Sequence, residues 1–214
     1  MINIEEKITR KSNLEQNDSI SCYMHHCAQQ THNVYPLFYS FLQEIKPARI
    51  LEIGTAAGGL TLFLAEMCKG LNLPTKITTY DIRRPQWSYD ELLQNGIDVN
   101  IENVFLRDSN EKNVINPILE FIKQDGVSLV LCDGGNKINE FNILSNHIKP
   151  GDFIMAHDYA KDRQFFNEHI NKKVWNWLEI TFDDIKDSVT TNNLVKYEKV
   201  NFDMGVWACF QKVI

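Results

Sequence analysis

The sequence predicts an α/β fold, with a mostly parallel sheet, helices on both of its faces and an antiparallel hairpin at the C-terminus. Two observations carry this prediction. Between residues 49 and 156, short apolar runs of strand length alternate with longer stretches of helical spacing, which is the pattern of βαβ units. Residues 194–200 and 206–213 then alternate as paired strands do, around a short segment that contains Gly205.

The composition is that of a globular chain with one domain. Its 214 residues suffice for a full core, and 43% of them are hydrophobic and 23% charged. A net charge of −6 argues against nucleic-acid partners, because their phosphates attract basic proteins. No apolar run approaches membrane-spanning length, the N-terminus lacks a signal-peptide core, and five scattered cysteines fit a reducing compartment. We therefore expect a cytoplasmic protein without a membrane partner, and a homo-oligomer remains open.

Residues 1–46 are expected to form an N-terminal helical extension before a single domain at residues 47–214. Apolar side chains recur at helical spacing over residues 34–45, and Pro47 follows shortly after. We interpret the polar residues before this helix as a lid over a ligand pocket, with a disordered or partner-binding arm as the alternative. The cysteines and histidines at positions 22–27 are zinc-ligand types, but without a second pair they match no common zinc site.

The first strand, turn and helix lie within residues 49–66, which read RILEIGTAAGGLTLFLAE. An apolar run ending at Ile53 precedes a glycine-dense turn at residues 54–59 and a helix-forming run. This order places backbone N–H groups at a helix N-terminus, where they can hold a polar ligand. Glu52 lies at the carboxyl edge of the strand, where open α/β sheets bind their ligands. The glycines also fit the dinucleotide pattern G-x-A-x-x-G loosely, so a dinucleotide-binding turn and a plain strand–helix turn remain alternatives.

Two further strands are expected to end near ligand-binding residues. The second strand leads into Asp81, whose carboxylate can accept hydrogen bonds from both hydroxyls of a ribose. Ile82 is then placed to cover an adenine ring. We expect the third strand at residues 103–106, so that Asp108 and Ser109 face the edge of the adenine.

Acidic residues follow two consecutive buried strands further along the chain. Residues 128–132 form a strand that ends at Asp133, and residues 152–156 form the next, followed by His157 and Asp158. Because the carboxyl ends of parallel strands meet at one edge of a sheet, we expect the two aspartates to converge beside the turn. Hard oxygen ligands held in this way suit Mg²⁺. The alternative is that both acids only cap loops at strand ends.

The spacing Glu-x-Gly-x-x-x-Gly from Glu52 to Gly58 resembles the first motif of class I S-adenosylmethionine-dependent methyltransferases. The stretch DGGNKINEFNILSNHIKPGDFIMAHDY resembles the metal-dependent O-methyltransferase branch, near the cephalosporin-hydroxylase-type and macrocin (sugar) O-methyltransferase families. Catechol O-methyltransferase is similar more distantly. The likeness covers residues 46–160 by motif and the C-terminal tail by pattern. It implies a Rossmann-like class I methyltransferase fold with a mostly parallel seven-stranded sheet.

The resemblance also implies a site for S-adenosylmethionine with a magnesium ion and a base beside it. The implied cofactor-binding residues are Glu52, Gly54, Thr55, Gly58, Gly59, Asp81, Ile82, Asp108, Ser109 and Asp133. The implied metal ligands are Asp133, His157 and Asp158. Relatives often place a second oxygen ligand next to the position of Asp158, where this chain offers His157 or Tyr159. Imidazole is not a preferred donor to Mg²⁺, so the third ligand stays open. Lys137 and His157 are the candidates for the catalytic base, and a lysine that only starts a helix is the alternative.

The implied reaction is methyl transfer from S-adenosylmethionine to a hydroxyl of a sugar or of a glycosylated small molecule, with the metal lowering the pKa of that hydroxyl. A catechol- or phenol-type acceptor is the alternative within the same chemistry. Two readings from other classes stay open, namely a non-catalytic protein that binds S-adenosylmethionine and a nicotinamide-dependent oxidoreductase. The oxidoreductase would prefer a dinucleotide to S-adenosylhomocysteine.

Overall fold

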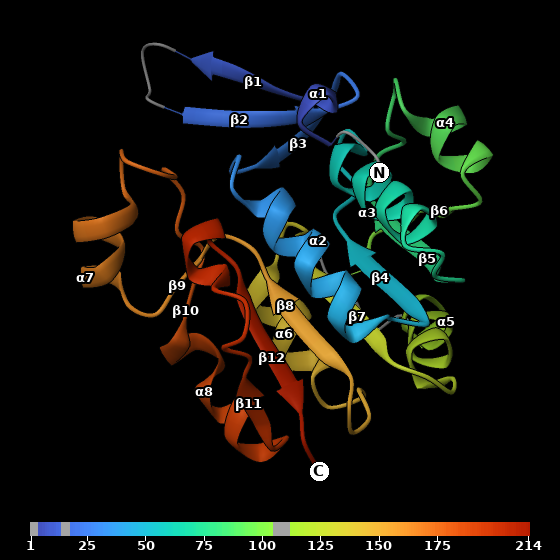
Figure 1. Cartoon of the computed structure of the whole chain (residues 1–214). Helices are drawn as coiled ribbons and strands as arrows, with labels where there is room; N and C mark the ends of the chain where they lie inside the picture. The colour runs from blue at the N-terminus through green and yellow to red at the C-terminus, as the bar shows by residue number, and fades with distance from the viewer. Residues whose placement is uncertain (1–3, 14–17, 105–111) are drawn as a thin grey trace.

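A computed structural model describes residues 4–13, 18–104 and 112–214 of the chain (Figure 1). Its centre is a seven-stranded sheet with the strand order β11-β12-β8-β7-β4-β5-β6. The strands are β4 (Arg49–Ile53), β5 (Lys76–Asp81), β6 (Asp98–Ile101), β7 (Ser128–Cys132), β8 (Phe153–Ala156), β11 (Leu194–Lys196) and β12 (Ala208–Lys212). The five strands from β4 to β8 pair in parallel, whereas β12 runs antiparallel to both β8 and β11. The predicted Rossmann-like sheet with its C-terminal antiparallel pair is confirmed.

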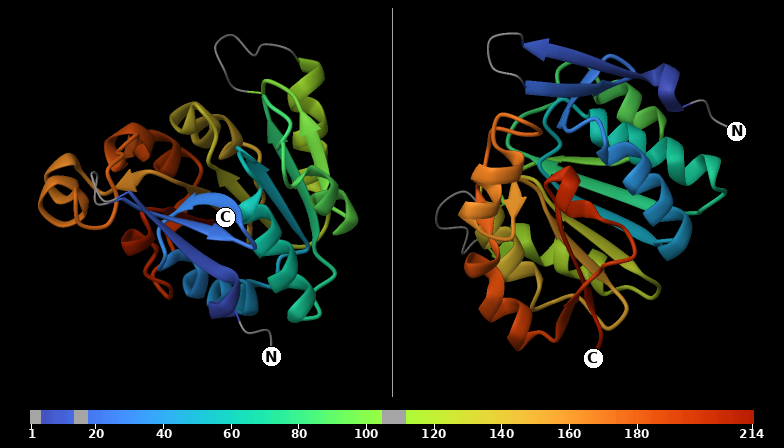
Figure 2. Two further views of the ribbon diagram at one scale, coloured as in Figure 1. Left: turned by 90° about the horizontal axis from the view of Figure 1, so that it is seen from above. Right: turned by 60° about the vertical axis from the view of Figure 1, so that its left-hand side comes forward.

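Helices cover both faces of this sheet. They are α2 (Val34–Ile45), α3 (Gly59–Gly70), α4 (Tyr89–Gln94), α5 (Lys112–Lys123), α6 (Lys137–Leu144), α7 (Arg163–Phe165) and α8 (Phe182–Thr191). Side chains alternate along a strand, so Ile50 of β4 packs in the core with α2 and α3, whereas Leu51 packs in the core with α5, α6 and α8. The left panel of Figure 2 shows these two helical layers on opposite sides of the sheet.

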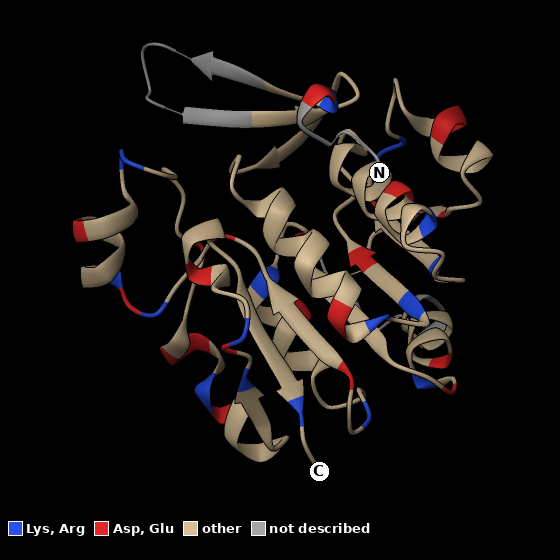
Figure 3. Cartoon of the chain, in the orientation of Figure 1, with Lys and Arg blue, Asp and Glu red and all other residues tan. Residues whose placement is uncertain are grey.

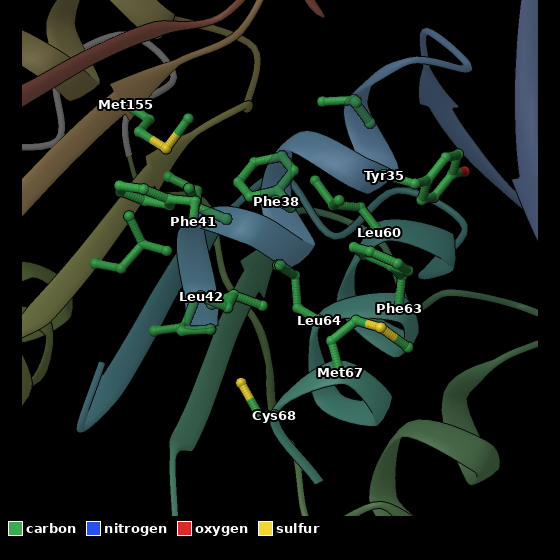
Figure 4. Packing of buried hydrophobic residues seen from close by; sticks show 14 of the residues in the cluster. Tyr35, Phe38, Phe41, Leu42, Leu60, Phe63, Leu64, Met67, Cys68 and Met155 are labelled. Carbon is green, nitrogen blue, oxygen red and sulfur yellow. The ribbon is translucent and has the colours of Figure 1, made fainter. Parts of the chain in front are cut away.

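Aromatic and aliphatic side chains fill the core between the sheet and the first helical layer. Figure 4 shows α2 and α3 facing each other there, with Met155 of β8 beside them. The rings of Tyr35 and Phe63 meet edge to face with their centroids 4.8 Å apart, and Phe41 meets Phe153 in the same way at 5.2 Å. This is the geometry that aromatic pairs favour. The predicted helix over residues 34–45 is therefore confirmed with its apolar face buried.

The first 30 residues differ from the expected helical extension. After a short helix, α1 (Ile4–Lys7), the chain forms a three-stranded antiparallel sheet of β1 (Ile8–Asn13), β2 (Asp18–Tyr23) and β3 (His26–Gln30). In β3, Ala28 and Gln30 are buried and Gln29 between them is exposed, a period of two that suits a strand and not a helix. Figure 1 shows this sheet above the carboxyl ends of the parallel strands. Its expected role as a lid stays a prediction.

Two other sequence expectations are corrected. The third parallel strand is β6, because Asp98 to Ile101 pair in register with Thr78 to Asp81 of β5. Of the expected strand at residues 103–106, Asn103 and Val104 lie after β6 and outside any strand, and residues 105–106 lie outside the described residues. The connection between β11 and β12 is longer than a hairpin turn, since it contains a 3₁₀ helix, η2 (Phe202–Gly205). Two further short strands, β9 (Tyr159–Ala160) and β10 (Ile180–Thr181), pair in parallel and enclose α7 and a π-helical turn, η1 (Phe166–Ile170). These segments lie directly after β8, beside the carboxyl edge of the sheet.

Charged residues lie mainly on helices and loops, with both signs interspersed (Figure 3). Strand β4 is an exception, because it holds Arg49 and Glu52, both buried. The Nη1 and Nη2 groups of Arg49 donate hydrogen bonds to the carbonyl oxygens of residues 124–126. Within the described residues, no helix combines the length and the apolar character needed to cross a bilayer.

Candidate active site

A cavity of about 410 Å³ lies at the carboxyl ends of the parallel strands. Seven of the residues singled out from the sequence line it, namely Gly54, Asp81, Ile82, Asp133, Lys137, His157 and Asp158. Residues that follow β4 and β5 line one end, and residues that follow β7 and β8 line the other. The structure thus brings the two predicted constellations into a single space.

The turn after β4 depends on glycine at its first position. Gly54 has a φ of +99°, and a Cβ built on it would lie 2.1 Å from the carbonyl oxygen of Asp133. Its N–H donates to the carbonyl oxygen of Tyr80 over 2.8 Å. Only glycine combines that backbone angle with so close an approach of a second chain segment. The turn is therefore held in close contact with the ends of both neighbouring strands, β5 and β7.

Asp81 shapes the same turn from the end of β5. Its Oδ2 accepts a hydrogen bond from the N–H of Ala56 over 2.7 Å, and its Oδ1 accepts one from the N–H of Arg83 over 3.0 Å. Ile82 follows in the cavity wall with 48% of its surface exposed. Two predicted residues, Asp108 and Ser109, lie outside the described residues.

Glu52 lies beneath the turn and not in the cavity. It is 1% exposed, and its Oε2 accepts hydrogen bonds from the hydroxyls of Thr61 and Thr79, each over 2.6 Å. Burial raises the pKa of Glu52 to about 7, although these two hydrogen bonds lower it in part. Thr55 bonds to the same Thr79 hydroxyl, again over 2.6 Å. We infer that Glu52 supports the turn from within, and a direct contact with a ligand stays a prediction.

Two glycines of the predicted cofactor set lie at the start of α3. Gly58 is the residue before the helix, and its N–H donates to the carbonyl oxygen of Thr55 over 2.8 Å. A Cβ on Gly59 would lie 2.5 Å from the carbonyl oxygen of His26 in β3. These glycines do not line the cavity, and Gly59 allows the N-terminal sheet to pack against α3.

Asp133 stands at the end of β7 and is held by two donors. Its Oδ1 lies 2.9 Å from Nδ1 of His157, and its Oδ2 accepts a hydrogen bond from Nε2 of Gln30 over 2.8 Å. Gln30 in turn accepts from the indole N–H of Trp207 over 2.8 Å. The N-terminal sheet therefore reaches into the site through Gln30.

Lys137 begins α6 and points its ammonium group at the acidic residues. Its Nζ lies 2.7 Å from Oε2 of Glu179, 3.1 Å from Oδ2 of Asp158 and 4.0 Å from Oδ1 of Asp133. Burial alone would lower the pKa of Lys137, but the neighbouring carboxylates outweigh it and raise the pKa above its usual range. Lys137 is therefore positively charged at neutral pH, which makes it a poor base.

Asp158 follows His157 in a left-handed backbone conformation, with a φ of +55°. Its Oδ1 accepts a hydrogen bond from the indole N–H of Trp175 over 2.5 Å. Burial would raise its pKa, yet the charges of His157 and Lys137 and these hydrogen bonds lower it. Asp158 therefore stays ionised beside the cavity.

His157 is nearly enclosed. Its ring lies between Trp207 and Trp175, with centroid distances of 4.9 and 5.3 Å, and its Nε2 is buried without a hydrogen-bond partner among the described residues. Burial would lower the pKa of His157, but the carboxylates of Asp133 and Asp158 outweigh it and raise the pKa. A histidine whose Nδ1 is tied to a carboxylate and whose ring is favoured in the protonated form is a weak candidate for a base.

The predicted metal ligands do not fit a magnesium ion as they are arranged. Three of the four carboxylate oxygens of Asp133 and Asp158 face protein N–H donors or His157, and the fourth faces the ammonium of Lys137. Within the described part of the chain, no group of three or more His, Cys, Asp or Glu side chains is placed to hold a metal. A magnesium ion would have to take the place between these acids that the ammonium group of Lys137 holds. The cation at the centre of this cluster is Lys137.

Sequence reasoning missed several polar residues in and around the site, among them Gln30, Glu140 and Glu179. Gln30 and Glu179 come from segments far from the strand ends, and nothing in their local sequence marks them. Glu140 does have a local signal, because it accepts hydrogen bonds from the N–H groups of Gly134 and Asn136 as an acid near a helix start often does. Burial raises the pKa of Glu140 to about 7.

Comparisons with known proteins agree with the fold. The family model described as rhamnosyl O-methyltransferase/CmcI matches residues 20–193. An apo structure of CmcI aligns with a TM-score of 0.60 at 12% identity, covering 88% of this chain and 74% of that chain. A CmcI structure named with Mg and SAM aligns with a TM-score of 0.55 at 14% identity, covering 87% of this chain and 76% of that chain.

A putative O-methyltransferase from Nostoc punctiforme also aligns, with a TM-score of 0.55 at 12% identity, over 84% of this chain and 56% of that chain. At such identities the structural likeness concerns the fold. No curated protein sequence is similar enough to match the chain. The family match spans most of the sequence, from the N-terminal sheet to the end of α8. The chain therefore belongs to the rhamnosyl O-methyltransferase/CmcI family and is a class I S-adenosylmethionine-dependent O-methyltransferase.

Proposed function

We propose that the chain transfers a methyl group from S-adenosylmethionine to a hydroxyl of a sugar or of a glycosylated small molecule. One observation carries this proposal: a single cavity joins the glycine turn and Asp81 at one end to Lys137 and Asp158 at the other. A methyl transferase needs both substrates in one closed space, because the reaction is an in-line displacement between them. The description of the matching family supports a sugar hydroxyl as the acceptor.

The turn end suits the cofactor. When bound, S-adenosylmethionine supplies an electrophilic methyl group on a positively charged sulfur. The turn after β4 offers backbone polar groups, and Asp81 offers a carboxylate at the position expected for ribose hydroxyls. Ile82 offers an apolar surface for the adenine ring. These assignments to a cofactor are part of the proposal.

The opposite end suits a hydroxylated acceptor. Asp158 provides a carboxylate, which can accept hydrogen bonds from hydroxyls. Trp175 and Trp177 stand beside it in the cavity wall, and Trp177 is 55% exposed. An exposed indole face next to charged groups favours a ring that carries hydroxyls on its edge.

The proton of the acceptor hydroxyl needs a group that can receive it. Lys137 already donates to oxygen atoms, and the ring of His157 is buried with Nδ1 tied to Asp133. Asp158 is ionised and lines the cavity. We therefore assign the proton to Oδ2 of Asp158, in place of the expected base Lys137 or His157. The expected magnesium ion, supported by the name of one CmcI structure, is given no step because the ligands do not fit it.

Incubation with methyl-labelled S-adenosylmethionine tests the proposal. We expect label in glycosides and not in catechols, read by mass spectrometry. Asp158→Asn should lower kcat by roughly 10² to 10⁴, as loss of base assistance does, and leave the affinity for S-adenosylhomocysteine unchanged. Asp187→Asn, an exposed acid on α8, is the matched control and should behave as the wild type. Label in catechols alone would refute the acceptor class, and full activity of Asp158→Asn would refute the base.

A further inference from the structure

Oxygen atoms from three separate segments of the chain surround the ammonium group of Lys137. Its Nζ lies 2.9 Å from the carbonyl oxygen of Gly134, in addition to its contacts with Glu179 at 2.7 Å and Asp158 at 3.1 Å. An ammonium group has three protons, and this arrangement gives each of them an acceptor. Lys137 thus occupies the point where the acids of neighbouring strands converge, which is the place that a bound cation would take.

The two aspartates are also held by donors other than Lys137. Gln30 and His157 contact the two carboxylate oxygens of Asp133, and the indole N–H of Trp175 donates to Oδ1 of Asp158. A divalent cation would have to share these oxygens with their donors. It would also have to enter beside an ammonium group and next to a histidine that lies 3.7 Å from Asp158. Like charges this close disfavour its binding.

Lys137 is fixed at both its backbone and its side chain. Glu179 accepts from the backbone N–H of Lys137 through Oε1, over 3.1 Å, and from Nζ through Oε2. The side chain is 7% exposed. A buried charge persists only when it is paired and hydrogen-bonded, as this one is. The ammonium group is therefore a permanent part of the site and not a mobile surface charge.

Building on the proposed function, we propose that the ammonium of Lys137 takes the place of a divalent metal: it positions Asp133 and Asp158 and balances their charge, so that methyl transfer needs no metal ion. An ammonium group in place of a metal ion leaves the covalent chemistry of methyl transfer unchanged. The carbon–sulfur bond of S-adenosylmethionine breaks, the oxygen–carbon bond forms, and the hydroxyl proton passes to Asp158. Lys137 is a positioning residue that acts through Asp158.

Removal of the ammonium should create a metal site. In Lys137→Ala, the carboxylates of Asp133, Asp158 and Glu179 lose their central cation and become free to hold a divalent ion. In Lys137→Arg the positive charge stays, so no metal should bind. Lys137→Gln keeps most of the side-chain volume without the charge, and it replaces Lys137→Ala in the experiment if the alanine variant folds poorly. Lys186→Ala removes an exposed lysine of α8 and is the matched control.

Titration with Mn²⁺, followed by electron paramagnetic resonance at neutral pH, tests the proposal in the protein saturated with S-adenosylhomocysteine. We expect no specific site in the wild type, in Lys137→Arg or in Lys186→Ala. In Lys137→Ala or Lys137→Gln we expect one site, with affinity at least roughly tenfold above the wild type, because one fixed positive charge is gone. Adding Asp158→Asn to either variant should abolish it. The activity of the wild type should not change with a chelator, and that of Lys137→Ala should rise when Mg²⁺ is added.

Two results would overturn the proposal. One is a wild-type Mn²⁺ site that Asp158→Asn removes, and the other is a failure of both neutral variants to gain any site. Affinity for S-adenosylhomocysteine, measured on the same samples by calorimetry, keeps the proposed function separate. If the wild type does not bind S-adenosylhomocysteine, the methyltransferase assignment is contradicted. If the wild type binds S-adenosylhomocysteine and also has a specific Mn²⁺ site, only the role of Lys137 is contradicted.

Discussion

The two ends of the cavity are built in different ways. The turn end is formed by backbone groups and one carboxylate from a continuous part of the chain, Gly54 to Ile82. The opposite end is lined by side chains from distant segments, among them Asp133, Lys137 and Trp175. Gln30 holds Asp133 and Glu179 holds Lys137 from outside the lining. Local backbone geometry therefore fixes the cofactor end, whereas tertiary packing fixes the acceptor end. We expect the first to tolerate almost no change in backbone shape, and the second to respond mainly to changes in charge and hydrogen bonding.

The largest effect is expected at the turn itself. Gly54→Ala places a Cβ 2.1 Å from a backbone oxygen at a φ of +99°. Overpacking and backbone strain together should cost about 3 kcal/mol or more of unfolding free energy, measured by chemical denaturation. Gly151→Ala is the matched control, since Gly151 has a φ of +90° but nothing within 4 Å of its Cβ position. It should cost only about 1 kcal/mol from strain. Equal costs for the two variants would show that the close approach does not matter.

The next effect concerns the pH dependence of stability beneath the turn. The pKa of Glu52 is about 7 in the folded chain against an ordinary 4.5, so the folded state binds more protons than the unfolded state between these values. The contribution of Glu52 to stability therefore falls as pH rises from about 4.5 to about 7. Relative to the wild type, Glu52→Gln should gain up to about 3 kcal/mol between pH 4.5 and pH 8, measured by denaturation at each pH. A difference that does not change with pH would contradict the buried position of the carboxyl group.

A smaller effect tests the carboxylate of the cofactor end. Asp81→Asn removes a charge that we assign to ribose hydroxyls, so affinity for S-adenosylhomocysteine should fall roughly 10- to 100-fold, or about 1.4 to 2.7 kcal/mol. Calorimetry measures this loss. Asp90→Asn changes a largely exposed acid on α4 and should leave the affinity as it is. If both variants bind as the wild type does, Asp81 has no part in the cofactor site.

The smallest effect tests how the N-terminal sheet joins the acceptor end. Gln30 is fully buried and links Trp207 to Asp133. Gln30→Ala leaves both partners without this bond, which should cost about 2 kcal/mol of unfolding free energy. Gln43→Ala, an exposed residue of α2, should change stability by no more than about 0.5 kcal/mol. Similar values for the two would mean that the sheet does not support the site.

The same contrast explains which features could be predicted from the sequence. Strand β7, helix α2 and the turn after β4 follow from apolar periodicity and glycine spacing, which are local signals. The sequence puts the third strand a few residues beyond β6. Because β6 is short and half polar, its position is decided by its pairing with β5. The N-terminal sheet was missed because its polar residues alternate only weakly.

The acceptor end was predicted in part. Asp133 and Asp158 were expected to converge because they end neighbouring parallel strands, and the structure brings both to the cavity. What sequence reasoning could not supply is the direction of side chains from other segments. Glu179 and Trp175 reach Lys137 and Asp158 only through the fold after β8. The presence of an ammonium group between the acids, and with it the poor fit for magnesium, follows from three-dimensional packing alone.

Calorimetric titration of the wild type with S-adenosylhomocysteine and, separately, with NAD⁺ tests most directly that the cavity is a methyltransferase site. We predict one S-adenosylhomocysteine bound per chain and no binding of NAD⁺. Preference for NAD⁺, or no binding of either molecule, would contradict it.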